Sequence, residues 1–273
     1  TLRTSSAASD VYKRQVDIML MSASNAEELF KKGIFKNSPV TPAVRMNDTS
    51  DIWGIRHGNY KKEMATPFRT ANLKNIKKFV NLGLFSVTFS KSLQHDLEML
   101  NAYRKFRQEA TINNFNYFLE VFNPQTKTGL NQLQLGEYVN DCILKTLAGQ
   151  LKSERPLFLK IAYNGPKAME ELAGYDPKNL IVGILGGGKG TTRDCFELIS
   201  KSCKYGAKVA LFGRKINLAE DQQLIVKTMR DVVNGMTSTE GVKFYHDQLK
   251  KKKIKPDRSL DKDLMITEKV LKL

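Results

Sequence analysis

The chain has 273 residues, of which 41% are hydrophobic and 26% are charged, and this suits one large domain with a sizeable core. It has no run of about 18 apolar residues and no apolar signal segment, so we expect neither a membrane-spanning helix nor a secreted protein. The formal net charge of +16 favours anionic ligands, whether nucleic acid, a membrane surface or phosphorylated metabolites.

The cysteines indicate neither a disulfide framework nor a structural metal site. Cys142, Cys195 and Cys203 are odd in number and lack the paired spacing of a zinc site. We therefore expect a soluble, cytoplasmic protein without a metal. Residues 1–15 are polar and aperiodic, resemble a non-native segment, and do not contribute to the predicted fold.

Short apolar, β-rich runs alternate with amphipathic helical patterns from one end of the chain to the other. The predicted strands cover residues 17–21, 40–46, 84–89, 117–122, 157–163, 180–185 and 208–212. The predicted helices cover residues 25–32, 93–111, 136–151, 167–172, 194–204 and 218–233. This alternation predicts a parallel sheet with right-handed crossovers.

The predicted fold is an α/β TIM (β/α)₈ barrel in which seven strands are recognisable and the first strand is lacking. The first recognisable strand, at residues 17–21, then counts as the second of the barrel. The barrel spans residues 16–236, and a basic helical extension covers residues 237–273. A doubly wound open sheet is the structural alternative.

One lysine interrupts an apolar strand. Lys160 lies inside the strand expected at residues 157–163, where an ammonium group is costly unless it is paired or neutral. Burial favours the neutral amine, which is the form that attacks a carbonyl carbon. Lys160 is therefore the candidate nucleophile. The alternative is a lysine that reaches the strand end or pairs with a core carboxylate.

Glu120 and Arg45 also stand in or at the end of predicted strands. Glu120 has apolar neighbours on both sides, which indicates a buried carboxylate with a cationic partner or an acid–base role. Arg45 shares a face with Asn47 at the end of the strand at 40–46. The carboxyl ends of barrel strands form the active site, so both are candidate catalytic residues. A structural ion pair is the alternative for each.

Two later strands end in glycine and a cation. Gly186, Gly187 and Gly188 precede Lys189 and a helix start, and such amides can approach a phosphate closely. The segment departs from a P-loop, since Gly190 follows the lysine, and from the dinucleotide fingerprint. The next strand ends in Gly213 and Arg214, as in the phosphate site after barrel strands seven and eight. A glycine turn without a ligand is the alternative.

This order of motifs resembles the class I (Schiff-base) aldolase superfamily, which includes deoxyribose-phosphate aldolase and the archaeal-type fructose-bisphosphate aldolases. The resemblance covers about residues 17–233. It implies a Schiff-base lysine on strand six, matched by Lys160, and phosphate contacts matched by residues 186–188 and by Gly213 and Arg214. Some relatives place a tyrosine proton donor on strand five, and Glu120 lies near that position.

The resemblance predicts a lyase that acts on a phosphorylated sugar without a cofactor, and a homo-oligomer. A non-covalent sugar-phosphate isomerase or synthase is the alternative enzyme hypothesis. A basic phosphate- or RNA-binding protein is the non-enzymatic hypothesis, and the lysine-rich run at residues 250–255 favours it. That run lacks interleaved aromatic residues, which argues against a nucleic-acid partner.

Overall fold

The computed structural model describes residues 16–273, so the predicted segment 1–15 lies outside the described residues. The described residues form two compact units, residues 16–159 and 160–273, and each is described by itself. The predicted boundary at residue 236 stays a prediction.

All seven predicted strands are confirmed in the described part of the chain. They follow one another in the sheet in the order β1-β2-β5-β6-β7-β8-β9. Their registers run parallel for β1 with β2, β2 with β5, β5 with β6 and β8 with β9. The strands are β1 (Ile18–Met21), β2 (Thr41–Arg45), β5 (Leu82–Thr88), β6 (Asn116–Phe122), β7 (Leu159–Ile161), β8 (Val182–Leu185) and β9 (Val209–Leu211).

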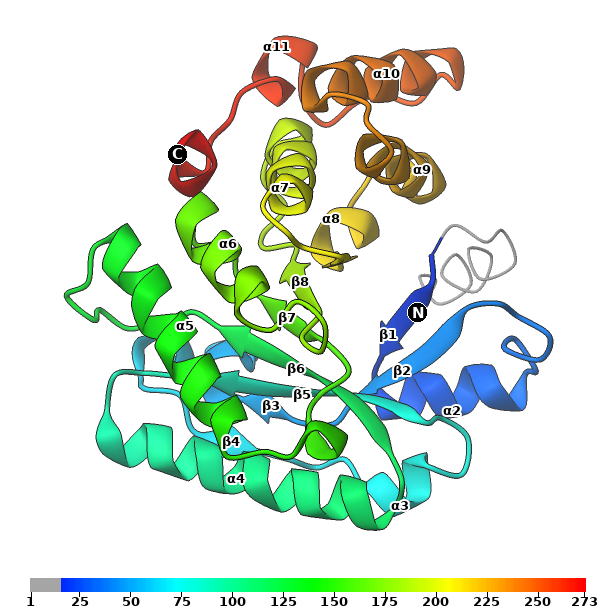
Figure 1. Ribbon diagram of the computed structural model, residues 1–273. Helices are drawn as coiled ribbons and strands as arrows, with labels where there is room; N and C mark the ends of the chain where they lie inside the picture. Colours follow the sequence, from blue (N-terminus) through cyan, green and yellow to red (C-terminus); the bar gives the residue numbers. More distant parts are fainter. Residues whose placement is uncertain (1–15) are drawn as a thin grey trace. The chain divides into compact units, whose positions relative to one another are not determined.

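The first unit alternates β1, β2, β5 and β6 with helices (Figure 1). Every residue of β5 is buried, and α4 packs on this strand with Phe106 stacked on Phe85 at a centroid distance of 4.5 Å. Asn131 caps α5 with a reciprocal capping box, which explains where that helix begins. The helices are α2 (Ala23–Lys31), α3 (Leu73–Ile76), α4 (Leu93–Ile112) and α5 (Gln132–Ala148), with 3₁₀ turns at Ser50–Ile52, Tyr60–Lys62 and Lys152–Glu154.

The long connection between β2 and β5 is folded rather than an open loop. It contains the antiparallel pair β3 (Asp48–Thr49) and β4 (Pro67–Phe68). Trp53 stacks on Tyr60 and packs against Phe68, with centroid distances of 5.5 and 4.9 Å. The three rings thus form a small aromatic cluster within the connection that follows β2.

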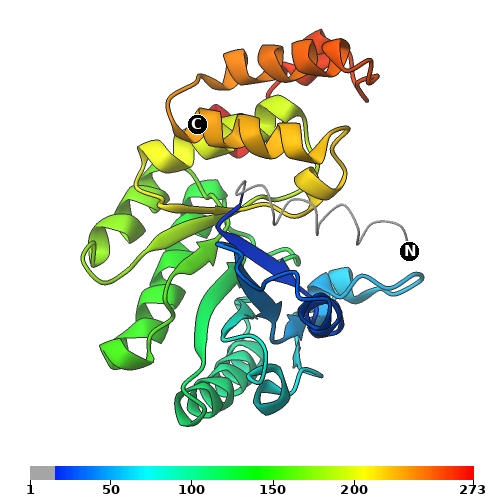
Figure 2. The same cartoon turned by 90° about the vertical axis from the view of Figure 1, so that its right-hand side faces the viewer.

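The second unit places helices after β7, β8 and β9. Three of its helices pack against one another, namely α7 (Thr192–Lys204), α9 (Gln222–Val233) and α10 (Ser238–Lys251). Figure 2 shows α10 running alongside α9. Gly241 lets α10 approach α7, since a Cβ at this position would meet the Phe196 ring at 2.9 Å. The helices are α6 (Pro166–Tyr175), α7 (Thr192–Lys204), α8 (Arg214–Asn217), α9 (Gln222–Val233), α10 (Ser238–Lys251) and α11 (Leu260–Asp263), with a 3₁₀ turn at Lys269–Lys272. No helix within residues 16–273 is both long enough and apolar enough to cross a membrane.

Candidate active site

Three neighbouring strands of the first unit bring Arg45, Ser86 and Glu120 together. Ser86 of β5 lies opposite Glu120 of β6 in the register, so their side chains share one face. The Ser86 hydroxyl donates to Glu120 Oε2 at 2.8 Å, and Arg45 Nη1 donates to the same oxygen at 3.2 Å. Arg45 Nη1 also donates to Ser86 Oγ at 2.9 Å. The structure thus joins two of the predicted catalytic residues directly.

Asn47 holds the backbone of Ser86 in place through its side chain. Its side-chain amide donates to the Ser86 carbonyl at 2.9 Å, and its carbonyl oxygen accepts from the Ser86 amide at 2.6 Å. These bonds continue the pairing of β2 with β5 beyond Arg45. The side chain that shares a face with Arg45 therefore positions the backbone of Ser86.

Two further carboxylates, Asp48 and Asp51, follow Arg45 on the connection to β5. Asp48 lies 3.8 Å from Arg45 Nη1, and burial raises the pKa of Asp48 although the arginine counteracts this. Burial also raises the pKa of Asp51, whose Oδ1 accepts from the Thr49 hydroxyl at 2.6 Å. The other oxygen of Asp51 is buried without a hydrogen-bond partner. Asp48 and Asp51 therefore take up protons more readily than exposed aspartates do.

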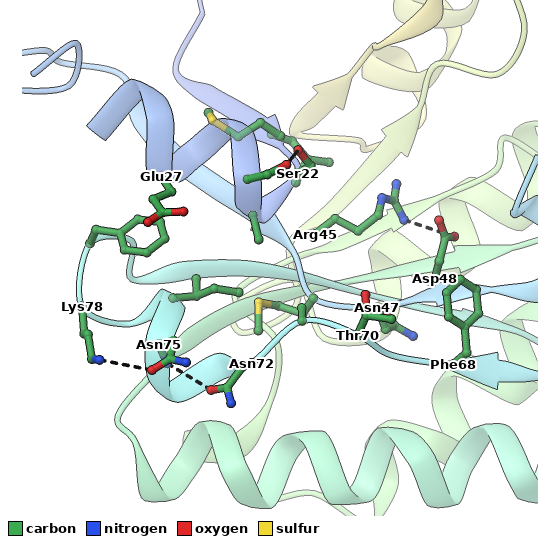
Figure 3. A pocket seen from close by; sticks show the side chains of 18 of the residues that line it. Ser22, Glu27, Arg45, Asn47, Asp48, Phe68, Thr70, Asn72, Asn75 and Lys78 are labelled. Carbon is green, nitrogen blue, oxygen red and sulfur yellow. Dashed lines mark hydrogen bonds and ion pairs between the residues drawn. The ribbon is translucent and has the colours of Figure 1, made fainter. Parts of the chain in front are cut away.

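A cavity of about 1170 Å³ opens beside this network within the first unit (Figure 3). Its walls come from the carboxyl ends of β1 and β2, the first turn of α2, α3 and the connection to β5. Arg45 and Asp48 lie at one side of the cavity, near Phe68, and Asn75 and Lys78 lie at the other. The cavity is large enough for a small-molecule ligand.

Lys160 belongs to the second unit. It lies in the middle of β7 and is 8% exposed, as the apolar run at 157–163 predicts. The chain leaves the strand through Gly165, which has a φ of 108°, and Pro166 then begins α6. Lys160 is thus a buried amine on a short strand. Its convergence with Arg45 and Glu120 stays a prediction.

The predicted phosphate-binding glycines form a tight turn after β8. The Gly186 amide donates to the Leu211 carbonyl of β9 at 3.0 Å. A Cβ at Gly186 would lie 2.2 Å from the Phe212 ring, so the close packing requires glycine here. Gly187 has a φ of 59°, which favours glycine as well. The Lys189 ammonium pairs with the carboxylate of Asp257.

The chain after β9 places Gly213 and Arg214 in exposed positions at the start of α8. Lys215, the next residue, is only 4% exposed and donates to the Thr192 hydroxyl at 3.1 Å. Burial lowers the pKa of Lys215 from its ordinary value, although nearby acidic groups oppose this. The second unit therefore contains two buried lysines, of which the sequence indicated one.

Ser86 and Lys215 are the residues that sequence reasoning missed. Ser86 carried a usable signal, because it is a polar residue inside a strand with apolar neighbours, like Glu120 and Lys160. Lys215 carried none, because it sits at a polar helix start. Among the described residues, no group of three or more histidine, cysteine, aspartate or glutamate side chains could hold a metal ion.

Comparison with solved structures identifies the fold. An archaeal fructose 1,6-bisphosphate aldolase superposes with a TM-score of 0.62 at 14% identity, covering 86% of this chain and 82% of that chain. The fold is that of these fructose-1,6-bisphosphate aldolases. This confirms the predicted TIM-barrel architecture with seven of its strands among residues 16–273, and the doubly wound sheet is set aside.

Two further neighbours agree. An archaeal fructose-1,6-bisphosphate aldolase with its catalytic Lys bound covalently to a carbinolamine intermediate has a TM-score of 0.61 at 15% identity, covering 86% of this chain and 82% of that chain. A Schiff base-forming fructose-1,6-bisphosphate aldolase has a TM-score of 0.57 at 12% identity, covering 85% and 99%. No family model matches the chain, and no curated protein matches its sequence. At these identities the likeness concerns the fold.

Proposed function

We propose that the protein is a class I aldolase that forms or cleaves a C–C bond in a phosphorylated sugar through a Schiff base on Lys160. The observation that carries the proposal is the buried amine of Lys160 in the middle of β7 in an aldolase fold. Counting β1 as the second barrel strand makes β7 the sixth, the place that the superfamily resemblance assigns to the nucleophile. One structural neighbour carries its substrate intermediate on a catalytic Lys.

The proposed reaction begins when the Lys160 amine attacks a ketone carbonyl carbon. Loss of water from the carbinolamine gives an iminium ion, which accepts the electron pair of the breaking C–C bond and becomes an enamine. The substrate hydroxyl next to the breaking bond loses its proton and becomes the carbonyl of the aldehyde product, which leaves. The enamine then takes a proton on carbon, and water hydrolyses the imine and restores the amine.

Glu120 is the proposed acid–base group for these proton transfers, and Arg45 is its positioning partner. Their contact at 3.2 Å, with Ser86 bonded to both, orients the carboxylate at a defined angle. A carboxylate held in this way exchanges protons without having to reorganise.

The substrate phosphate is proposed to bind at the turn after β8 and at the start of α8. The amides of Gly186, Gly187 and Gly188 supply donors, while Lys189 and Arg214 supply positive charge. Gly213 precedes Arg214 as the N-cap residue of α8. Binding at a non-reacting phosphate positions the carbonyl for attack.

Sodium borohydride trapping tests this function. The full chain is incubated with a panel of phosphorylated ketoses and aldehydes, reduced, and mapped by mass spectrometry. We expect one substrate to leave a stable adduct on Lys160, and Lys160→Met to abolish both adduct and turnover. Lys215→Met is the matched control, because it removes the other buried lysine of the second unit. An adduct on Lys215 or Lys189 would reassign the nucleophile. Turnover that survives in Lys160→Met would favour the non-covalent isomerase or synthase.

A further inference from the structure

The C-terminal segment of residues 257–268 lies on the glycine-rich turn and on the start of α7. The Asp257 carboxylate pairs with the Lys189 ammonium. Asp263 Oδ1 accepts from the Thr192 amide at 2.8 Å, and His246 holds its other oxygen at 2.9 Å. The segment thus brings carboxylates to a cation and to an amide that border the proposed phosphate site.

Asp194 in the first turn of α7 ties down the end of this segment. It accepts from the Thr267 amide at 2.7 Å, from the Thr267 hydroxyl at 2.5 Å and from the Glu268 amide at 3.2 Å. The Thr191 hydroxyl donates to the Met265 carbonyl at 2.7 Å. Burial alone would raise the pKa of Asp194, but these donors hold it below its ordinary value.

Glu268 lies beside the turn. A Cβ at Gly187 would be in van der Waals contact with Glu268 Oε1, at 3.8 Å. The hollow that Glu268 lines together with Gly186, Gly188 and Lys189 is too small to hold a water molecule. A phosphate group therefore cannot enter this hollow as it stands, with Glu268 as one of its walls.

The segment is attached by polar contacts rather than by a core. Asp263 is the one buried residue among positions 257–268, and apolar residues such as Met265 are partly or largely exposed. Leu271, just beyond the segment, is 1% exposed and anchors the end of the chain. A segment with few buried apolar contacts and anchored ends can open locally without unfolding the unit.

We propose that residues 257–268 form an autoinhibitory strap whose carboxylates occupy the phosphate-binding turn, and that a phosphate group binds there by displacing the strap. The inference rests on the proposed phosphate-binding role of the turn and deepens it by adding regulation of the same site. Phosphate and strap compete for Lys189 and for the space over the turn. Each therefore weakens binding of the other by the same factor.

The test measures inorganic phosphate binding and amide hydrogen exchange in the full chain. Asp257→Asn releases Lys189, and Asp261→Asn is the matched control because it removes one negative charge from an exposed position of the same segment. We expect Asp257→Asn to bind phosphate about fivefold more tightly than wild type, and Asp261→Asn to match wild type. In wild type, saturating phosphate should speed exchange at the Thr267 and Glu268 amides and protect the amides of residues 186–190.

The outcomes separate the strap from the proposed function. Equal gains in Asp257→Asn and Asp261→Asn would overturn the strap, because they would reflect general charge alone. Protection of residues 186–190 with unchanged exchange at Thr267 and Glu268 would also overturn it and leave the phosphate site intact. If phosphate protects the turn in none of the three proteins, the strap and the phosphate role both fail. The Lys160 adduct then decides independently whether the aldolase chemistry stands.

Discussion

The guanidinium of Arg45 lies 3.2 Å from the carboxylate of Glu120 across three neighbouring strands. Ser86 on the middle strand hydrogen-bonds to both groups, so one oxygen of Glu120 receives two donors. Glu120 is 1% exposed, whereas the Arg45 side chain is 30% exposed and borders the cavity. Arg45 therefore contacts both the buried carboxylate of Glu120 and the cavity.

Removing Arg45 should destabilise the protein, because the buried carboxylate of Glu120 loses the positive charge beside it. We expect Arg45→Ala to lower the free energy of unfolding by about 2–4 kcal/mol, because a buried carboxylate loses a cationic partner. Arg69→Ala is the control, since its ion pair with Glu109 is more exposed on the carboxylate side, and it should cost about 1 kcal/mol or less. Urea unfolding monitored by circular dichroism measures both. Equal losses would mean that burial of Glu120 carries no extra cost.

The strands and the three catalytic candidates were predictable because they depend on local pattern. Apolar runs of strand length predicted all seven strands, and a charge inside or at the end of such a run indicated Lys160, Glu120 and Arg45 as candidates. The strap was not predictable, because Lys189 and Asp257 are 68 residues apart and no periodicity links them. Burial of Lys215 likewise depends on distant residues that pack around it. Contacts of this kind appear only once the chain is folded.

Gly186 should tolerate no side chain. A Cβ there would lie 2.2 Å from the Phe212 ring, whereas a Cβ at Gly188 would meet nothing within 4 Å. We expect Gly186→Ala to lower the free energy of unfolding by about 1–3 kcal/mol and Gly188→Ala to change it by less than about 1 kcal/mol. Adding Phe212→Ala should shrink the cost of Gly186→Ala, because it removes the clash. A cost that is the same in both backgrounds would place the strain elsewhere.

Arg214 should act on substrate binding rather than on the chemical step. Its proposed contact is to a phosphate that does not react, so its contribution is the same in the ground and transition states. We expect Arg214→Ala to raise KM about 10- to 100-fold with little change in kcat. Lys208→Ala is the matched control, because Lys208 is an exposed cation just before β9 rather than after it. Steady-state kinetics with the substrate found by trapping would show the split. A fall in kcat at unchanged KM would contradict the phosphate role.

Glu268 should make the stability of the second unit depend on pH in a defined direction. Burial, with the charge of Asp194 adding to it, raises the pKa of Glu268 above its ordinary value of 4.5. A raised carboxyl pKa means that the folded state binds the proton more tightly than the unfolded state, so ionisation at neutral pH costs stability. This cost disappears as the pH falls through the folded pKa and then below 4.5.

We expect Glu268→Gln to be more stable than wild type at pH 7, with the advantage lost near pH 4, in urea unfolding at the two pH values. Asp261→Asn, an exposed change of the same charge, should show no such pH-dependent gain. An advantage of Glu268→Gln that persists unchanged at low pH would mean that the amide stabilises the strap by packing or hydrogen bonding and that relief of a buried charge plays no part.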